Sequence, residues 1–215
     1  MRNTTTSNRK ILIVLLTIIL CSGFIFLTFI AALFPPSAID LEISTAVQST
    51  QSPGLDSAMK FISWFGAFPV PMFIGLLVAI TFYLFKFKRE AIFIILTFIS
   101  GVISTVIKFI VDRPRPTMDM VRIVEIARQQ SFPSGHTLFY TIFFGFLLVL
   151  MWNLRQINFI VRTIVKLISA SLILMIPFSR IYLGAHWFTD VLGGFILGLI
   201  CLYIISILYL KKAQA

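Results

Sequence analysis

Six long apolar runs constrain this chain more than any other feature of its sequence. They cover residues 11–33, 64–85, 91–111, 137–152, 159–178 and 187–210. An α-helix needs about 20 apolar residues to cross a hydrocarbon core of about 30 Å. The fourth run approaches that length only if its helix begins near Ser134. The sequence therefore predicts an all-α, integral membrane bundle of six transmembrane helices.

The composition excludes a soluble domain of this size. Only 12% of the residues are charged and the mean hydropathy is +1.00, so the polar side chains are too few to cover a water-soluble core. No internal repeat or low-complexity linker divides the chain. We therefore expect residues 1–215 to form a single membrane-embedded domain.

The net charge of +10 predicts topology rather than nucleic-acid binding. With an even number of spans both termini lie on one side, and that side carries 11 basic residues against one acid, Glu90. The opposite side carries 7 basic and 7 acidic residues. Because basic residues concentrate in cytoplasmic loops, we expect cytoplasmic termini and no nucleic-acid partner. The compact size favours a bacterial plasma membrane.

The first run could instead be a secretory signal, because basic residues precede it. Its length exceeds the roughly 7 to 15 apolar residues of a signal-peptide core, so a membrane anchor is favoured. Cys21 and Cys201 lie inside runs without metal-ligand spacing, and we expect them to be small buried residues. Gly194 and Gly198 form a GxxxG pattern, which is typical of close helix packing.

Three segments on the outward side carry the chemistry-bearing residues. The first, residues 34–63, has Ile39, Ile43, Ala46 and Val47 at roughly helical spacing, which predicts a short amphipathic helix on the membrane surface. A role for this segment as a substrate gate has no support in the sequence.

The second outward segment begins with KFIVDRPRP at Lys108 and ends with SFPSGHT at residues 131–137. Considered by itself, Lys108 could simply extend its amine to the membrane–water interface, and the prolines could simply end the helix. Ser134, Gly135 and His136, however, stand at the start of an apolar run. Free N–H groups and the positive end of a helix dipole favour an anion there.

The third segment reads SRIYLGAHWFTD, residues 179–190. His186 and Asp190 are four residues apart, so they share a face if the sixth helix has begun at that point. The carboxylate would then orient the imidazole and leave its other nitrogen free as a nucleophile or base. Arg180 lies just after the fifth run.

In a chain of six spans these three segments must meet on one membrane face. We therefore expect one cluster that combines fixed cations, a helix start and two histidines, a combination suited to binding a phosphate and breaking its ester. Its candidate members are Lys108, Arg113, Arg115, Ser134, Gly135, His136, Arg180, His186 and Asp190.

The order and spacing of these residues resemble a known signature. The patterns K-x6-R-P, then P-S-G-H, then S-R-x5-H-x3-D, which begin at Lys108, Pro133 and Ser179, resemble the three motifs of the type 2 phosphatidic acid phosphatase family. That family includes phosphatidylglycerophosphatase B and undecaprenyl pyrophosphate phosphatases and is related to vanadium haloperoxidases. The resemblance extends over essentially the whole chain and implies a bundle of six spans.

The resemblance implies a role for each matched position. His186 would attack phosphorus and form a phosphohistidine, and Asp190 would orient it. His136 would protonate the leaving alcohol and then activate water. The implied phosphate-binding residues are Lys108, Arg115, Ser134, Gly135 and Arg180. No metal and no cofactor are implied, because the fixed cations take the place of magnesium.

Several alternatives stay open at the level of sequence. The substrate could be phosphatidylglycerophosphate, phosphatidate or undecaprenyl pyrophosphate, cleaved at the outer membrane face. Arg113, Arg122 and Arg128 could meet a second phosphate, although solvated loop charges are the favoured interpretation. A phosphotransferase on the same fold, or a transporter that binds lipid without cleaving it, are the rival functions. The sequence predicts no oligomeric state.

Overall fold

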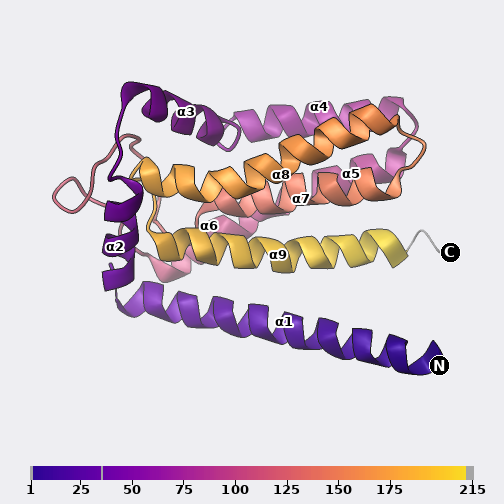
Figure 1. Ribbon diagram of the computed structural model, residues 1–215, viewed down its shortest axis with the longest axis horizontal. Helices are drawn as coiled ribbons and strands as arrows, with labels where there is room; N and C mark the ends of the chain where they lie inside the picture. Colours follow the sequence, from indigo (N-terminus) through magenta and orange to yellow (C-terminus); the bar gives the residue numbers. More distant parts are fainter. Residues whose placement is uncertain (1, 35, 212–215) are drawn as a thin grey trace.

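The structure is a computed structural model that describes residues 2–34 and 36–211, and every regular element in these ranges is an α-helix (Figure 1). The helices are α1 (Arg2–Leu33), α2 (Ala38–Val47), α3 (Pro53–Trp64), α4 (Val70–Leu84), α5 (Lys88–Leu96), α6 (Ile99–Val111), α7 (Gly135–Asn153), α8 (Phe159–Tyr182) and α9 (Phe188–Lys211). The all-α prediction is therefore confirmed for the described part of the chain.

Five apolar segments of the described residues are long enough to cross a membrane, and they correspond to five of the six predicted spans. They are Ile11–Leu33, Lys88–Val111, Gly135–Asn153, Phe159–Tyr182 and Phe188–Lys211. The predicted start of the remaining span, residues 64–85, was too early, because α3 ends at Trp64 and α4 begins only at Val70, after Pro69. The 15 residues of α4 rise about 22 Å, so a sixth crossing stays a prediction.

Two other predicted spans have different boundaries in the structure. The third is broken into α5 and α6 by a turn at Thr97 and Phe98. The Thr97 hydroxyl donates to the Ile94 carbonyl at 2.6 Å, a bond that competes with the regular helix ladder. The fourth begins at Gly135 with Ser134 as its N-cap, which confirms the earlier start that its length required.

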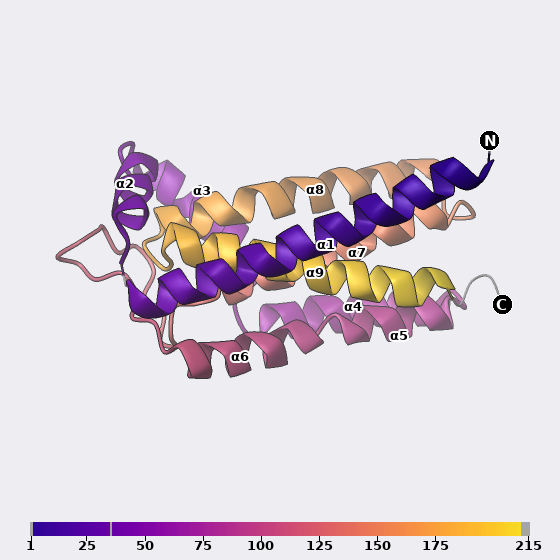
Figure 2. The same cartoon turned by 90° about the horizontal axis from the view of Figure 1, so that it is seen from below.

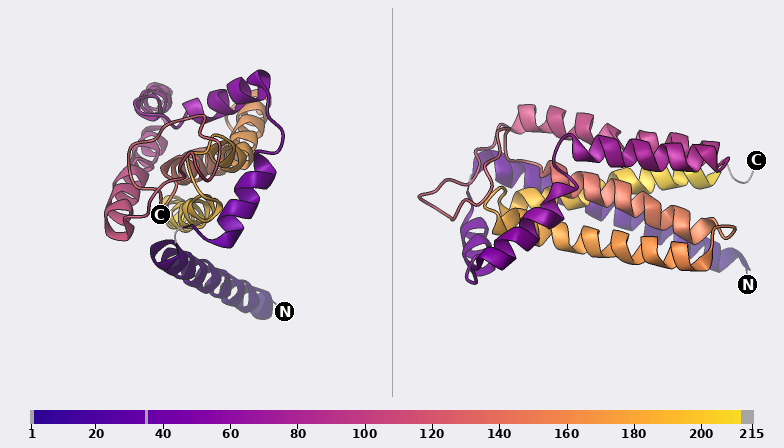
Figure 3. Two further views of the ribbon diagram at one scale, coloured as in Figure 1. Left: turned by 90° about the vertical axis from the view of Figure 1, so that its left-hand side faces the viewer. Right: turned by 90° about the horizontal axis from the view of Figure 1, so that it is seen from above.

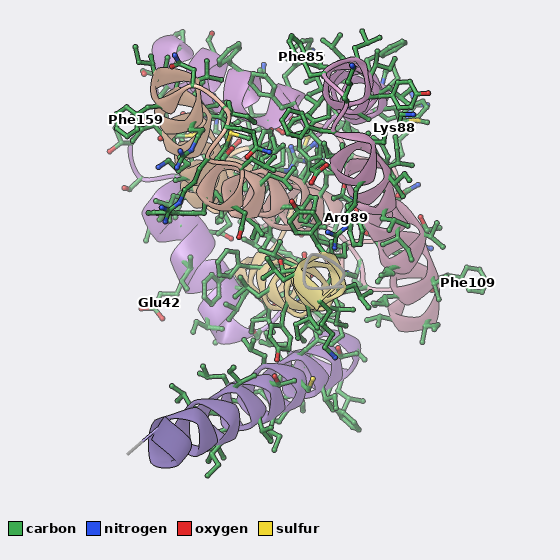
Figure 4. The ribbon with its side chains drawn as sticks, turned by 90° about the vertical axis from the view of Figure 1, so that its right-hand side faces the viewer. Glu42, Phe85, Lys88, Arg89, Phe109 and Phe159 are labelled. Carbon is green, nitrogen blue, oxygen red and sulfur yellow. The ribbon has the colours of Figure 1, made fainter. Side chains whose placement is uncertain are left out.

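Helix α7 forms the centre of the bundle, and α8 and α9 pack along it (Figure 1). Of the residues in the apolar part of α7, 72% are buried, whereas only 6% are buried in the apolar part of α1. Helix α1 lies outermost in the bundle, beside α9 (Figures 2 and 3). Large apolar side chains therefore face outward, such as Phe109 of α6, which is 80% exposed (Figure 4). A surface of this kind, with large apolar side chains facing outward, requires a lipid environment.

Cys21 is also exposed, on α1, so the prediction that both cysteines are buried is wrong for Cys21.

The two ends of the bundle differ in chemistry. The start of α1 and the end of α9 lie together at one end, and α2 lies at the other with the α6–α7 loop, residues 112–134 (Figure 1). At the first end Arg89 points toward α9 (Figure 4) and donates to the Tyr209 carbonyl, while the Tyr209 hydroxyl donates to Glu90 at 2.8 Å. The described ends of α1 and α9 thus lie at one end of the bundle, and the cytoplasmic location of both termini stays a prediction.

The GxxxG pattern of α9 marks a close approach to α7, as the sequence predicts. A Cβ on Gly198 would lie 2.6 Å from Cβ of Thr141, and a Cβ on Gly194 would lie 2.6 Å from the Ser134 carbonyl oxygen. At the same level the Ser134 amide donates to the Asp190 carbonyl at 3.0 Å. The two glycines therefore hold the starts of α7 and α9 together.

The substitution Gly194→Ala should lower the free energy of unfolding by about 1–3 kcal/mol, because the added methyl meets a backbone carbonyl that has no room to move. The check is the apparent melting temperature of the purified protein in detergent. Gly101→Ala is the matched control, since nothing lies within 4 Å of its added Cβ and alanine favours a helix over glycine. Equal melting temperatures for the two variants would contradict the close approach.

Candidate functional site

A cavity of about 980 Å³ lies among the ends of α6, α7 and α8, at the end of the bundle that carries α2. Six of the eight residues to which the family resemblance assigns a role line it, namely Lys108, Arg115, Gly135, His136, Arg180 and His186. The other two, Ser134 and Asp190, are fully buried behind its wall. Segments that are far apart in the sequence therefore meet here, as the ordering of the spans predicts.

The α6–α7 loop forms one wall of the cavity, and the turn between α8 and α9 fixes it in place. The amides of Val124 and Glu125 donate to the Leu183 carbonyl at 3.0 and 3.1 Å. Gly184 makes this contact possible, because it has a φ of +66° and a Cβ there would lie 2.2 Å from the Arg122 carbonyl oxygen. The turn that fixes the loop also carries His186.

Backbone carbonyls orient two of the basic side chains. The Lys108 amine donates to the carbonyls of Gln130 and Ser131. The Arg115 guanidinium donates to the carbonyls of Gln129, Gln130 and Ala185. Burial and the neighbouring charge of Arg180 lower the pKa of Arg115 to about 10, so it remains a cation at neutral pH.

The third basic side chain, Arg180, is paired with the one carboxylate that lines the cavity. Its Nη1 donates to Glu125 Oε1 at 2.9 Å and to the Ser63 hydroxyl. Its Nε is buried and has no hydrogen-bond partner among the described residues. An anion in the cavity could occupy this donor or compete with Glu125.

His186 and Asp190 lie side by side, although His186 precedes α9 instead of standing on it. His186 Nδ1 is 3.6 Å from Asp190 Oδ2, which exceeds hydrogen-bond length but leaves the carboxylate directly behind the ring. On the other side of the ring, Nε2 lies 3.3 Å from Arg115 Nη1. Burial, with the charges of Arg115 and Lys108, lowers the pKa of His186 well below 6.5, so the ring is neutral at physiological pH.

Asp190 is held rigidly by groups other than His186. Its Oδ2 accepts hydrogen bonds from the Ser131 hydroxyl and from the Trp187 amide, the latter at 2.8 Å. Its Oδ1 accepts from Arg113 Nη1 at 2.6 Å. The carboxylate thus caps the start of α9 and fixes its own orientation toward His186.

His136 faces the cavity from the first turn of α7, and its Nε2 has no hydrogen-bond partner among the described residues. The turn between α3 and α4 packs against its ring: a Cβ on Gly66 would lie 2.5 Å from His136 Cδ2 and 2.9 Å from Tyr140 Cε2. No sequence pattern indicates this contact, which brings a segment outside the three motifs against a predicted catalytic residue.

Ser134 has a structural position in this geometry. Its hydroxyl accepts from the Thr137 amide at 3.4 Å and from the Thr137 hydroxyl at 3.0 Å, and the residue is fully buried. It therefore caps α7 and leaves the next amides free to face an anion. Direct contact between the Ser134 hydroxyl and a phosphate would require that hydroxyl to leave the cap.

The interpretation of Arg113 as a solvated loop charge is wrong, whereas Arg122 is partly exposed but ion-paired. Arg113 is 1% exposed and lies between Asp40 and Asp190. Arg122 makes a two-point contact with Asp56 at 2.6 and 2.9 Å, and this contact, with a bond from Tyr182, lowers the pKa of Asp56 to about 2. Arg128 is exposed at the cavity wall, as a loop charge would be.

The short helix predicted in residues 34–63 is present as α2, and its buried side is polar; its position on the membrane surface stays a prediction. Asp40, Ser44 and Gln48, which repeat at the helical spacing of four, are buried against the bundle. The apolar residues of this helix, such as Ile39, face outward. The spacing of the apolar residues gave no indication of Asp40, although Ser37 and Asp40 form a capping-box pattern at the helix start.

The part of the cavity away from the charges is apolar and open to the side of the bundle. Phe68, Met72, Val102 and Val106 line it from α4, α6 and the turn before α4, and all four are exposed. The cavity thus joins a cationic end to a surface that faces lipid.

The sequence is similar to those of two phosphatases. The chain is 28% identical over 193 residues to phosphatidylglycerophosphatase B of Bacillus subtilis, an alignment that covers 86% of this chain and 92% of that protein. It is 31% identical over 167 residues to lipid phosphate phosphatase gamma of Arabidopsis thaliana, over 74% of this chain and 69% of the relative.

Two solved structures have the same fold. The crystal structure of a PAP2-type phosphatidylglycerolphosphate phosphatase from Bacillus subtilis superimposes with a TM-score of 0.76 at 25% identity, covering 89% of this chain and 96% of the other. The Aquifex aeolicus LpxE structure gives 0.62 at 23% identity, over 83% and 98%. The PAP2 superfamily model matches residues 89–214. Because this segment is more than half of the protein and contains all three motifs, the chain belongs to the PAP2 superfamily of lipid phosphatases.

Proposed function

We propose that the protein hydrolyses the terminal phosphate of a lipid phosphate at the extracytoplasmic face of the plasma membrane. The reaction would proceed through a phosphohistidine on His186 and without a metal ion. One observation carries this proposal: an imidazole in the cavity wall has a carboxylate 3.6 Å behind its Nδ1 and a guanidinium 3.3 Å from its Nε2. Nε2 is therefore the ring nitrogen beside the cations that would hold a phosphate, and the carboxylate stands behind the other nitrogen.

The phosphate would bind among three cations. Arg115 and Arg180 can each contact two oxygens, Lys108 supplies a third charge, and the free amides at the start of α7 face the same space. Without a substrate, Glu125 forms an ion pair with Arg180 Nη1, so the phosphate would replace or share that contact. This charge distribution supports an anionic ligand over a neutral one.

The reaction would proceed in two balanced steps. In the first, the Nε2 lone pair of His186 forms a bond to phosphorus, the bond from phosphorus to the ester oxygen breaks, and His136 protonates the departing alkoxide. In the second, His136 takes a proton from water, whose oxygen attacks phosphorus and releases His186 and inorganic phosphate. Asp190 would stabilise the cationic ring between the steps, and the bound phosphate would favour protonated His136.

The apolar side of the cavity supports a lipid substrate. A phosphate at Arg180 would leave its hydrophobic body to extend between Met72 and Val106, which line the cavity and face the membrane. Phosphatidylglycerophosphate, phosphatidate and undecaprenyl pyrophosphate all fit this description, since each joins a terminal phosphate to a long apolar chain.

The side chains that line the cavity suit a reaction in which basic side chains, in place of a metal ion, neutralise the phosphate. Among the residues that the structure describes, no three His, Cys, Asp or Glu side chains gather where they could hold a metal ion. Three basic side chains line the phosphate end of the cavity instead. They would neutralise the charge that magnesium neutralises in many other phosphoryl-transfer enzymes.

The purified protein should therefore release inorganic phosphate from all or some of these three lipids in detergent that contains a chelator. A side-by-side assay of the three would identify the preferred substrate. Substrate labelled with ³²P separates the rivals: a hydrolase puts the label into inorganic phosphate, and a phosphotransferase puts it into an added alcohol or lipid acceptor. Binding of the lipids without any cleavage would contradict the proposal and favour a transporter.

A further inference from the structure

A buried network of charges lies behind the proposed nucleophile, and part of it comes from outside the three motifs. Arg113 Nη2 donates to Asp40 Oδ2 at 2.7 Å, and Arg113 Nη1 donates to Asp190 Oδ1 at 2.6 Å. All three side chains are completely buried. Thr189 joins the two sides, because its hydroxyl is 2.6 Å from Arg113 Nη1 and donates to Asp40 Oδ1 at 2.9 Å.

Asp40 reaches this network from α2, the helix that lies across the ends of α8 and α9 (Figures 1 and 3). Its carboxylate also accepts from the amide and hydroxyl of Ser37 and from the amide of Thr189. Gln48, which directly follows α2, donates from Nε2 to the carbonyls of Arg122 and Tyr182. Helix α2 is thereby fixed to both the α6–α7 loop and the α8–α9 turn.

We propose that Asp40 is a positioning residue of the phosphatase: it neutralises Arg113, so that the negative charge of Asp190 remains available to the ring of His186. The inference rests on the proposed function, because it assigns a role in the reaction of His186. It adds a residue from the first outward segment, to which none of the three motifs extends.

The reason is the balance of charge in a place that water does not reach. Asp40, Arg113 and Asp190 together carry one net negative charge, and a phosphorylated His186 ring carries one positive charge. The buried group is therefore neutral when the intermediate forms. Without the charge of Asp40, Arg113 and Asp190 would neutralise each other, and the cationic ring would face no net negative charge.

Asp40 acts on a ring that other charged groups also face. The titratable and charged groups around His186 are Lys108 of α6, Arg115 of the α6–α7 loop, His136 of α7, Arg180 of α8 and Asp190 of α9. The cations among them disfavour a positive charge on the ring. The excess negative charge that Asp40 supplies opposes this effect from behind.

The substitution Asp40→Asn preserves the shape of the side chain and removes its charge. We expect kcat for the preferred lipid phosphate to fall about 10- to 100-fold, with KM changed less than about threefold, because Asp40 does not touch the substrate. The acidic limb of the pH profile of kcat/KM should move to lower pH by about half a unit to one unit, since protonated His186 loses a stabilising charge. Ionisation of the substrate is common to all variants and cancels in this comparison.

The double variant Asp40→Asn with Arg113→Gln separates charge balance from simple structural damage. It removes one negative and one positive charge, so the network again carries one net negative charge, on Asp190. We expect the double variant to recover at least about tenfold in kcat over Asp40→Asn, with its acidic limb close to that of the wild type. A purely structural role for Asp40 predicts that the two substitutions add their losses.

The matched control is Asp56→Asn. Asp56 is a second carboxylate on the same outer face that pairs with an arginine of the same loop, Arg122, but it does not contact Asp190 or His186. Its kcat and pH profile should match those of the wild type. If Asp40→Asn cannot be purified as folded protein, the double variant alone decides, because it must keep kcat within about 100-fold of the wild type.

Two results would overturn the inference. One is a folded double variant that is less active than Asp40→Asn, and the other is an Asp40→Asn protein whose loss in kcat leaves the pH profile unmoved. Failure of the proposed function would look different, because the wild-type protein itself would then release no phosphate from any of the three lipids.

Discussion

Replacing His186 with alanine should lower kcat for phosphate release at least about a thousandfold, because the variant has no nitrogen that could bond to phosphorus. The remaining cations, Lys108, Arg115 and Arg180, still line the cavity, so binding of the lipid phosphate should survive. We therefore expect KM for any residual activity, or Kd for the substrate, to change far less than kcat. The measurement is phosphate release from purified protein together with binding of the labelled lipid.

Labelling of the phosphorylated enzyme tests the same variant by a second measurement. Wild-type protein quenched during turnover with ³²P-labelled substrate should carry label that is stable in alkali and lost in acid, the behaviour of a phosphoramidate bond. The His186→Ala protein should carry none. Glu42→Ala serves as the control, because Glu42 is exposed on α2 and points away from the bundle (Figure 4). Activity of His186→Ala above one tenth of the wild type would disprove the nucleophile assignment.

The sequence predicted the parts of the fold that depend on local patterns. Apolar runs of the required length predicted the long helices, and the cap at Ser134 fixed where α7 begins. The order of the spans then implied that residues near Lys108, His136 and His186 share one end of the bundle, and they line one cavity. Each of these predictions needs only periodicity, helix length and the alternation of sides.

The sequence could not predict contacts that depend on how distant segments pack. Arg113 lies in a loop of mixed charge, so its side chain gave no sign that it would be buried against Asp40, which is 73 residues away. The same holds for Gly66, whose contact with His136 depends on how the α3–α4 turn packs against α7. Buried charge pairs of this kind are specified by the folded structure and have no local pattern.

The break between α5 and α6 shows a third limit. Thr97 and Phe98 lie within an apolar run that satisfies the length for one span, and no proline or glycine stands at the break itself. The bend follows from the hydroxyl bond of Thr97 and from the fit of Phe98 against α4, where a Cβ on Gly75 would lie 2.2 Å from Phe98 Cζ. Phe98 also lines the cavity, so this packing shapes the site.

The substitution His136→Asn should act differently on substrates with different leaving groups. The variant cannot protonate a departing alkoxide, so kcat for a lipid monoester such as phosphatidate should fall by about 10²- to 10⁴-fold, the range expected for loss of a general acid. The loss in the first step should be much smaller for 4-nitrophenyl phosphate, because 4-nitrophenolate departs without a proton.

The second step of the same variant yields the sharper test. Water activation also depends on His136 in the proposed mechanism, so phosphorylated His186 should accumulate in His136→Asn when the first step is fast. We therefore expect a burst of 4-nitrophenol close to one equivalent per enzyme, followed by slow turnover. His186→Ala is the control and should give no burst. Equal losses on both substrates, with no burst, would mean that His136 binds the phosphate and does not transfer a proton, because a binding role weakens every substrate alike.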